Sequence, residues 1–469
     1  MGYRKKRITH EKVLELTKDL PSKNFCPAPF LHTYINANNR GYKFCCMSKI
    51  TDRWDVMEDL QTQFKAYWTG ETYQQARKDF FNNKFPEVCD WWCGRFEREG
   101  LWHQSDRIAF LEKFTSKYGN LNDFEWDIVN GNKHGKPISM DLRTGKLCNL
   151  KCRSCNTVWS TEIQKEVLAN EEIQKWSHWD TITLYPGSMR KAIQVPWEDP
   201  DFDILSNLDL SAINYLKMSG GESLIDPRVW KLLEKLANND LAKNINLHLI
   251  TNITYLTDKI ADILSKFRGL TFSLSVDGIG ELDEYLRPGD NVKWSQKEKV
   301  FDKIFKFDNL NWAQVMHVVQ PANCFRMPEH VEWFVNKQKQ HEKMSGVTFN
   351  PIVEPRFLHI GWLDDDHKEE ILKLCNYCTS EFKMDENDKT NWWLDVVKSE
   401  LNMKTGAHGK KHGSFTDPVD RARFANDYVK HQLALDKIRG TDTLKIVPEM
   451  KRYFDRYDPN HTTQPPERP

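Results

Sequence analysis

Three cysteines, Cys148, Cys152 and Cys155, lie within eight positions in the stretch "CNLKCRSC". In a protein whose thiols stay reduced, clustered cysteines indicate metal or redox chemistry more often than a structural role. Zinc usually takes four ligands in two close pairs, whereas this stretch supplies three thiolates with no histidine or fourth cysteine nearby. Three thiolates on a [4Fe-4S] cluster leave one iron without a protein ligand. The spacing therefore predicts a cluster whose open iron binds a substrate or a cofactor.

The composition indicates a soluble chain in a reducing environment. Lysine plus arginine and aspartate plus glutamate number 67 each, so no overall charge draws the chain onto a nucleic acid. The mean hydropathy is -0.68, and no apolar run approaches the ~18 residues that suggest a membrane span. The N-terminus "MGYRKKRITHEKV" lacks the pattern of a secretion signal. We therefore expect a cytoplasmic protein without disulfides and without a membrane or nucleic-acid partner.

Six short apolar segments that follow residue 137 are typical of β-strands. They cover residues 138–143, 213–220, 245–252, 270–278, 312–320 and 346–353. Helical patterns lie between several of them, for example over 226–240 and 257–267, and another helix is predicted over 420–440. This alternation predicts an α/β fold with a parallel sheet, and six such units predict an open or partial (β/α) barrel. Chemistry in such a barrel gathers at the C-terminal ends of the strands, where the cysteine loop lies.

Further residues with chemical potential follow the later strands. They are Gly220, Gly221 and Glu222 in "KMSGGES", Thr251 and Asn252 in "LITNIT", Ser275 and Asp277 in "SLSVDG", and Arg287 in "EYLRPG". By themselves these motifs are also typical of turns and helix caps.

Together with the cysteine spacing, these motifs resemble the radical S-adenosylmethionine superfamily. The resemblance implies a partial (β/α)6 TIM-like barrel in which the cysteine triad holds a [4Fe-4S] cluster and the open iron is chelated by S-adenosylmethionine. Reductive cleavage of that cofactor gives a 5′-deoxyadenosyl radical, which abstracts a hydrogen atom from the substrate. The cofactor supplies the difficult chemistry and the protein supplies placement and dryness.

The resemblance also assigns cofactor contacts. Gly220, Gly221 and Glu222 match the Gly-Gly-Glu motif that holds the methionine amino group. Thr251, Asn252, Ser275 and Asp277 match positions that touch the cofactor ribose or carboxylate, with a turn or a helix cap as the alternative. Arg287 matches an arginine of the auxiliary-cluster subgroup that reaches the cofactor carboxylate, with a surface role as the alternative. Ser154 departs from the family, which often has an aromatic residue there beside the adenine.

The N-terminal segment holds five cysteines, Cys26, Cys45, Cys46, Cys89 and Cys93, and resembles the twitch/SPASM module of the same superfamily. The resemblance implies one auxiliary [4Fe-4S] cluster on Cys26, Cys89, Cys93 and one of the adjacent pair. Adjacent residues in a strand point to opposite faces, so only one of the pair is expected to reach the cluster, and Cys45 is preferred. A structural zinc site is the alternative. In the family this module usually follows the barrel, whereas here it precedes it.

The predicted organisation has four parts. They are an N-terminal extension over 1–20, a cysteine-rich α+β auxiliary-cluster domain over 21–110, the partial barrel over 135–360, and a helical C-terminal extension over 361–469 with a mobile loop at 404–418 and a disordered tail at 461–469. An insertion over 160–210 is expected near the barrel mouth. The remaining cysteines, Cys324, Cys375 and Cys378, are interpreted as core residues, with a metal site, radical protection or hydrogen-atom donation as alternatives.

Three functions are compatible with this pattern. The first is a radical enzyme that modifies a peptide or protein side chain, supplied with electrons by a flavodoxin- or ferredoxin-type donor. The second is a radical enzyme that oxidises or rearranges a small metabolite of sugar or nucleoside type. The third is a non-catalytic iron-sulfur or zinc scaffold, which would have no need of a Gly-Gly-Glu motif.

Overall fold

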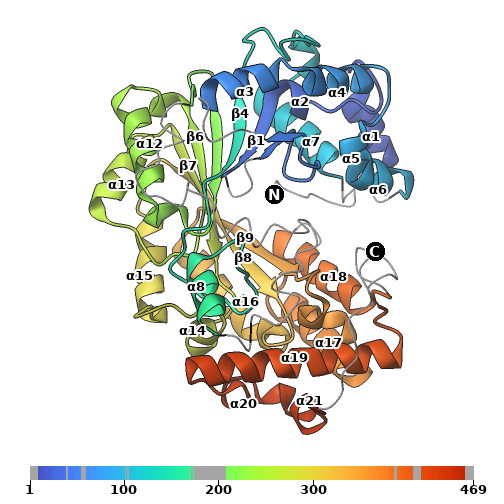
Figure 1. Ribbon diagram of the computed structural model, residues 1–469, viewed down its shortest axis with the longest axis vertical. Helices are drawn as coiled ribbons and strands as arrows, with labels where there is room; N and C mark the ends of the chain where they lie inside the picture. The colour runs from blue at the N-terminus through green and yellow to red at the C-terminus, as the bar shows by residue number, and fades with distance from the viewer. Residues whose placement is uncertain are drawn as a thin grey trace. The chain divides into compact units, whose positions relative to one another are not determined.

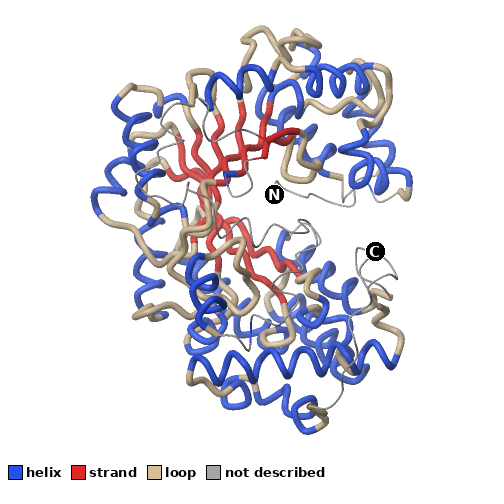
Figure 2. The backbone as a smooth tube through the Cα atoms, viewed as in Figure 1, coloured by secondary structure: helices blue, strands red, loops and turns tan. Residues whose placement is uncertain are grey.

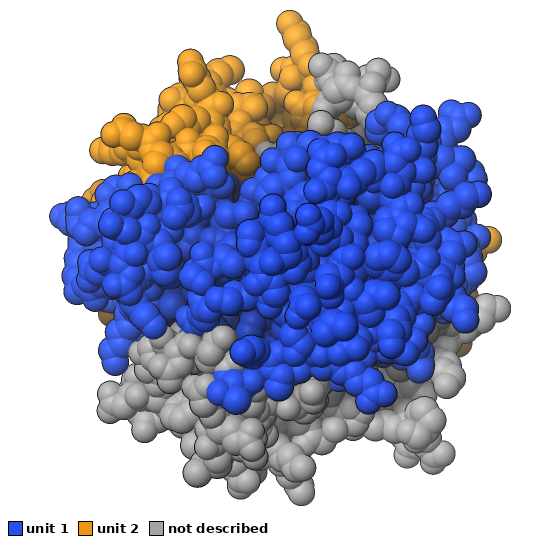
Figure 3. Space-filling model, turned by 90° about the horizontal axis from the view of Figure 1, so that it is seen from above, with its two compact units in different colours: residues 1–146, 194–250, 257–271 blue, residues 147–193, 251–256, 272–469 orange. Residues whose placement is uncertain are grey.

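The computed structural model describes residues 9–37, 41–53, 60–100, 102, 105–170, 173, 208–384, 388–404 and 413–459. The chain forms two compact units, which Figure 3 colours separately. Unit 1 comprises residues 1–146, 194–250 and 257–271, and unit 2 comprises 147–193, 251–256 and 272–469. The predicted tail at 461–469 lies outside the described residues, as do most of the predicted insertion and mobile loop. The four-part division stays a prediction.

The described residues contain a nine-stranded sheet of order β3-β2-β1-β4-β5-β6-β7-β8-β9 (Figure 2). The strands are β1 His32–Asn36, β2 Gly41–Lys43, β3 Asp52–Arg53, β4 Ser139–Arg143, β5 Tyr215–Ser219, β6 Asn246–Thr251, β7 Gly269–Ser275, β8 Leu310–Val319 and β9 Met344–Pro351. The six predicted strands are β4 to β9. The neighbours β1, β4, β5 and β6 run parallel, as do β8 and β9, whereas β2 and β3 are antiparallel. The predicted α/β fold class is therefore confirmed.

Unit 1 surrounds its strands with short helices (Figure 1). They are α1 His10–Thr17, α2 Ala28–Leu31, α3 Leu60–Trp68, α4 Glu71–Phe81, α5 Glu87–Cys89, α6 Arg95–Arg98, α7 Asp106–Tyr118, α12 Pro227–Asn238 and α13 Asp258–Ser265. Helix α12 begins where the Asp226 side chain caps its N-terminus and Pro227 takes the first turn. Val229, Leu232, Leu233 and Leu236 recur at helical spacing and are buried. The predicted helices over 226–240 and 257–267 are confirmed.

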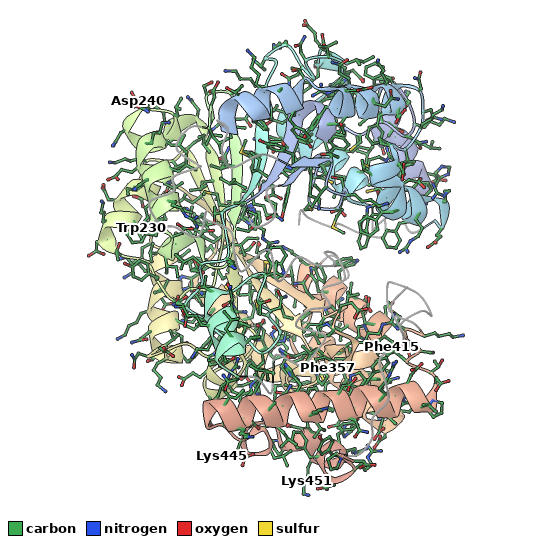
Figure 4. The ribbon with its side chains drawn as sticks, in the orientation of Figure 1. Trp230, Asp240, Phe357, Phe415, Lys445 and Lys451 are labelled. Carbon is green, nitrogen blue, oxygen red and sulfur yellow. The ribbon has the colours of Figure 1, made fainter. Side chains whose placement is uncertain are left out.

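Unit 2 carries the remaining helices. They are α8 Thr161–Ala169, α14 Glu281–Leu286, α15 Trp294–Ile304, α16 Met327–Gln340, α17 Asp365–Glu381, α18 Lys389–Leu401, α19 Pro418–Arg439, α20 Thr443–Ile446 and α21 Lys451–Asp455. The longest, α19, is the helix predicted over 420–440; it is capped by Asp417 and ends at the left-handed Gly440. Phe357 and Phe415, both labelled in Figure 4, pack their rings against His431 and Phe424 of this helix. In the described part of the chain, no helix is both long and apolar enough to span a membrane.

Candidate functional site

The cysteine loop follows β4 and is fixed by backbone hydrogen bonds to the segment after α14. The Lys151 amide donates to Pro288 at 2.7 Å and the Arg153 amide donates to Leu286 at 2.9 Å. At Gly289 a Cβ atom would lie 2.5 Å from Leu150 and 2.7 Å from the Asn149 carbonyl, so only glycine allows this approach. These contacts within the protein therefore hold the cysteine loop in place.

The three cysteines of this loop form no disulfide and lie together around the buried Leu150. The amide nitrogen of Asn252 lies 3.9 Å from the Cys148 sulfur and donates to Asn149 at 3.0 Å. Burial raises the pKa of the Cys152 thiol, and the guanidinium of Arg287 opposes that rise. An amide donor and a buried cation favour negative sulfur, which is the form that binds iron. The donor set therefore fits a cluster held by three thiolates.

A single zinc ion requires its sulfur ligands to lie closer together than a [4Fe-4S] cluster does. Four Zn–S bonds of about 2.3 Å bring tetrahedral sulfurs to about 3.8 Å from one another. Among the described residues, no group of three or more His, Cys, Asp or Glu side chains is arranged to hold one metal ion. A [4Fe-4S] cluster is a larger body with one thiolate on each bound iron.

The Gly-Gly-Glu motif forms the turn after β5 and contacts the end of β4. The Gly221 amide donates to the Gly145 carbonyl at 2.9 Å. A Cβ atom on Gly220 would lie 2.6 Å from the Thr144 hydroxyl and 3.0 Å from the Gly145 carbonyl. Glu222 is buried, and its Oε1 accepts from the Leu224 amide at 3.0 Å, which caps a short 3-10 helix. The motif therefore ties two strand ends together, three residues before Cys148 in the chain.

We expect Gly220→Ala to lower the free energy of unfolding by about 1 to 3 kcal/mol, because the new methyl group overpacks this turn. Urea unfolding measures the change. Adding Thr144→Ala removes the nearest clashing atom and should restore part of the loss. A Gly220→Ala protein as stable as the wild type would contradict the close approach of β4 and β5.

Asp277 and Arg287, both predicted to contact a cofactor, bind each other. Arg287 Nη1 donates to Asp277 Oδ2 at 2.7 Å, and the Val318 amide donates to Asp277 Oδ1 at 2.8 Å. The Asp277 side chain is 1% exposed and the Arg287 side chain is 10% exposed, so little of Arg287 is open to solvent. Burial would lower the pKa of Arg287, but Cys152 and Asp277 raise it well above its usual range. Arg287 Nε has no hydrogen-bond partner among the described residues.

Thr251 and Asn252 both make turn hydrogen bonds. Thr251 Oγ1 accepts from the Ile253 amide at 3.1 Å, and Asn252 Oδ1 accepts from the Thr254 amide at 3.1 Å. Ile253 has a φ of 56°, which is uncommon for a β-branched residue. Both residues thus have the turn role that was the alternative to a cofactor contact. The Asn252 amide nitrogen also lies near the Cys148 sulfur. Ser275 is the half-buried last residue of β7.

Arg153, inside the cysteine loop, is a positioning residue that no motif in the sequence indicates. Its guanidinium is buried and donates to Gln432, Asp436 and Thr441 at 2.7 Å each. It also lies 3.8 Å from the centroid of the Tyr285 ring. The loop is therefore fastened to α19 by a side chain between Cys152 and Cys155. The neighbouring Ser154 is half-buried. Nothing in the sequence marks partners this distant along the chain.

The N-terminal cysteines gather in unit 1. Cys26, Cys45 and Cys93 are buried and Cys89 is half-buried. Cys89 and Cys93 are separated by about one turn, where α5 runs into a short π-helix over Asp90–Gly94.

Neighbouring thiols contribute to the pKa shifts of three of these four cysteines. Burial raises the pKa values of Cys26 and Cys93 to about 12, and Cys93 adds to the rise at Cys26. Burial also raises the pKa values of Cys45 and Cys89 well above their usual range, with neighbouring thiols adding to both shifts. Negative sulfurs this close to one another require a compensating positive charge, which a bound cluster would supply.

The adjacent cysteines differ in surroundings. Cys45 and Cys46 lie in a turn after β2, so the expectation that a strand separates them is wrong. Cys45 nevertheless interacts with Cys89 and Cys93, whereas Cys46 interacts with Asp106, Lys217 and Asp141. This difference favours Cys45 as the ligand.

The last three cysteines are buried in unit 2. Cys375 and Cys378 lie one turn apart on α17, and burial raises the pKa of each to about 12. The Cys324 thiol donates to the Pro321 carbonyl at 3.5 Å. Such thiols are inert toward oxidation and metal exchange, which agrees with the core interpretation.

No protein-family model matches the chain, and no curated protein matches it. Solved structures show a partial likeness. Native anSMEcpe with bound AdoMet and Cp18Cys peptide has 17% identity and a TM-score of 0.32, over 53% of this chain and 61% of that chain. SuiB of Streptococcus suis bound to precursor peptide SuiA has 15% identity and a TM-score of 0.33, over 63% of this chain and 60% of that chain. TYW1 with a lysine-pyruvate adduct bound has 12% identity and a TM-score of 0.27, over 52% of this chain and 74% of that chain. The chain thus spans about three fifths of the first two proteins.

Proposed function

We propose that this chain is a radical S-adenosylmethionine enzyme. The observation that carries the proposal is the cysteine loop of unit 2, where three cysteines lie on one tightly held turn beside the Asn252 amide, with the Arg287 cation acting on Cys152. When bound, a [4Fe-4S] cluster with S-adenosylmethionine supplies a 5′-deoxyadenosyl radical for hydrogen abstraction. The loop supplies three ligands and an enclosed, preorganised setting.

The residues proposed to hold S-adenosylmethionine follow the strand ends. Gly220, Gly221 and Glu222 would bind its amino group, and Thr251, Asn252, Ser275, Asp277 and Arg287 would bind its carboxylate or ribose. Arg287 has the clearest chemical support. The Asp277 carboxylate orients its guanidinium, and its Nε–H lacks a partner among the described residues, which suits a carboxylate acceptor. Glu222 is the weaker assignment, since one of its oxygens already caps a helix.

The proposed second centre is an auxiliary [4Fe-4S] cluster on Cys26, Cys45, Cys89 and Cys93. Two buried arginines fix the segment that contains Cys26. Arg107 donates to the Phe25 carbonyl at 2.9 Å and pairs with Glu97, and Arg77 donates to the Pro29 carbonyl at 2.9 Å. Rigid backbone on both sides of a cysteine favours a preformed ligand set. A flavodoxin- or ferredoxin-type protein would supply the electron.

The proposed substrate is a peptide or protein side chain. The second candidate is a small polar metabolite, and one observation favours it: the sheet of unit 1 carries the buried polar side chains of His32, Asp141 and His248. Binding of a small ligand there would also accommodate a single polar side chain of a peptide.

The experiment is anaerobic incubation of iron-reconstituted, dithionite-reduced protein with S-adenosylmethionine and no added substrate. We expect slow formation of 5′-deoxyadenosine and methionine, because cleavage does not require a substrate once the cofactor is placed. Cys155→Ser should abolish the products. Cys46→Ser is the matched control, since that cysteine is not a proposed ligand and should leave product formation unchanged. Wild-type protein that contains its full iron and releases no 5′-deoxyadenosine would favour the scaffold function.

A further inference from the structure

One face of the parallel sheet in unit 1 is polar while its other face is apolar. Parallel register places Tyr34, Asp141, Lys217 and His248 side by side on β1, β4, β5 and β6. The preceding row contains His32, Ser139 and Tyr215. We call these seven residues the polar face. The alternate residues on the same strands are apolar and buried, among them Ile35, Leu142, Leu216 and Leu249. Strand alternation therefore directs the polar side chains to one side.

The polar face is tied together by hydrogen bonds between strands. Lys217 Nζ donates to Asp141 Oδ2 at 3.1 Å, His32 Nδ1 lies 2.9 Å from Ser139 Oγ, and the Tyr215 hydroxyl lies 2.9 Å from His248 Nδ1. His32, Asp141 and His248 are 2%, 7% and 3% exposed. These side chains are thus held in fixed positions away from solvent.

Two of the held side chains have unused hydrogen-bonding atoms. Asp141 Oδ1 and His32 Nε2 have no partner among the described residues, although both atoms are buried. Buried polar atoms without partners are rare because they lose their hydrogen bonds to water. When several lie on one preorganised surface, a ligand or bound water is expected to satisfy them.

Among the described residues, the lysines around the polar face outnumber the carboxylates. In the described part of the chain, Lys43, Lys113 and Lys217 are the lysines of this group, whereas the carboxylates that act on them are Asp141 and Asp106. Helix α7 supplies Lys113, whose Nζ lies 3.6 Å from the centroid of the Tyr215 ring. An excess of positive charge on half-buried side chains is costly unless an anion accompanies it.

The protonation states agree with this excess. Burial would raise the pKa of Asp141, but Lys217, His32 and Lys113 lower it to about 2, so this carboxylate is charged. Burial lowers the pKa of Lys113 to about 7; Lys217 adds to the shift and Asp141 opposes it. Burial also lowers the pKa of His32 to about 3, and His248 shifts in the same direction. The histidines are therefore neutral hydrogen-bonding groups.

We propose that the polar face binds a small ligand that carries a carboxylate next to a hydroxyl or amino group. Lys113 and Lys217 face the carboxylate, and the neighbouring hydroxyl or amino group donates to Asp141 Oδ1. His32 Nε2 supplies a further contact. This pattern matches a hydroxy acid or an amino acid, free or as a residue of a peptide. That the ligand is also the substrate of the radical reaction rests on the proposed function.

The test uses glycolate as the probe and competitive acetylation by acetic anhydride as the readout, with mass spectrometry to follow each lysine in the full-length protein. An anion beside Lys113 raises its pKa. A rise of about one unit at pH 7 lowers the free amine from about one half to about one tenth, so acetylation of Lys113 should slow about fivefold. Lys117, one turn further along α7, bonds to Asn214 and serves as the internal control.

Three outcomes would overturn the proposal. They are an unchanged Lys113 rate in glycolate, equal protection of Lys113 and Lys117, and equal protection by ethylene glycol, which lacks the carboxylate. Stronger protection by inorganic phosphate than by glycolate would overturn the carboxylate assignment.

Two variants extend the test. Lys113→Met should abolish the rise in melting temperature that glycolate produces, and Lys117→Met should retain it. Lys113 is half-buried and forms no ion pair among the described residues, so its loss leaves Asp141 paired with Lys217. Because binding is measured without S-adenosylmethionine or reductant, its failure is distinct from a failure to form 5′-deoxyadenosine.

Discussion

Replacing Cys148, Cys152 and Cys155 together by alanine is expected to lower the iron content of the anaerobically reconstituted protein from about eight to about four atoms per chain. The triad holds one proposed cluster, and the N-terminal cysteines hold the other. Iron and acid-labile sulfide analysis measures the change, and the variant should form no 5′-deoxyadenosine.

The complementary variant separates the two centres. Replacing Cys26, Cys89 and Cys93 by alanine should also leave about four irons, but these should be bound by the triad and remain able to cleave S-adenosylmethionine. Wild-type protein with about four irons would contradict the auxiliary cluster. Loss of all iron in either variant, with the protein still folded, would show that the two centres do not form independently.

The second large effect is expected for Arg153→Leu. This change leaves the Asp436 carboxylate and the Gln432 side chain without their buried partner, and breaking a buried ion pair in this way costs about 3 to 5 kcal/mol. Urea unfolding of the protein without cluster measures the loss. Arg153→Lys keeps the positive charge but lacks the several N–H donors of the guanidinium. This variant should therefore recover only part of the lost stability.

Arg452→Leu is the matched control for Arg153. Arg452 pairs with Asp366 at 2.5 Å, but their side chains are 42% and 63% exposed. Exposed pairs contribute about 1 kcal/mol or less. An Arg153→Leu protein that loses no more stability than Arg452→Leu would contradict the fastening of the cysteine loop to α19.

Local pattern was sufficient to predict the strands β4 to β9 and the helices α12, α13 and α19. The six strands and the helices after β5 and β6 were predicted because alternating and 3.6-residue apolar periods follow directly from strand and helix geometry. The cysteine triad was found for a similar reason, since its spacing lies within one loop of the sequence.

Long-range pairing could not be predicted in this way. Nothing local indicates that β1 pairs with β4, or that Asp141 and Lys217, 76 residues apart, form an ion pair. The same holds for Asp277 and Arg287, which were predicted as separate cofactor contacts and lie against each other. Cys45 and Cys46 were expected to point to opposite faces as adjacent strand residues do, whereas both lie in the turn after β2.

The sequence by itself determined the fold class and the candidate ligands, because periodicity and cysteine spacing are properties of short segments. The tertiary structure decided what surrounds those ligands. Arg153 reaches Asp436 across 283 residues, and the polar face requires four strands from three distant segments to align in register. Such contacts join residues that are distant in the sequence, and the local preferences of short segments do not specify which distant segments pair.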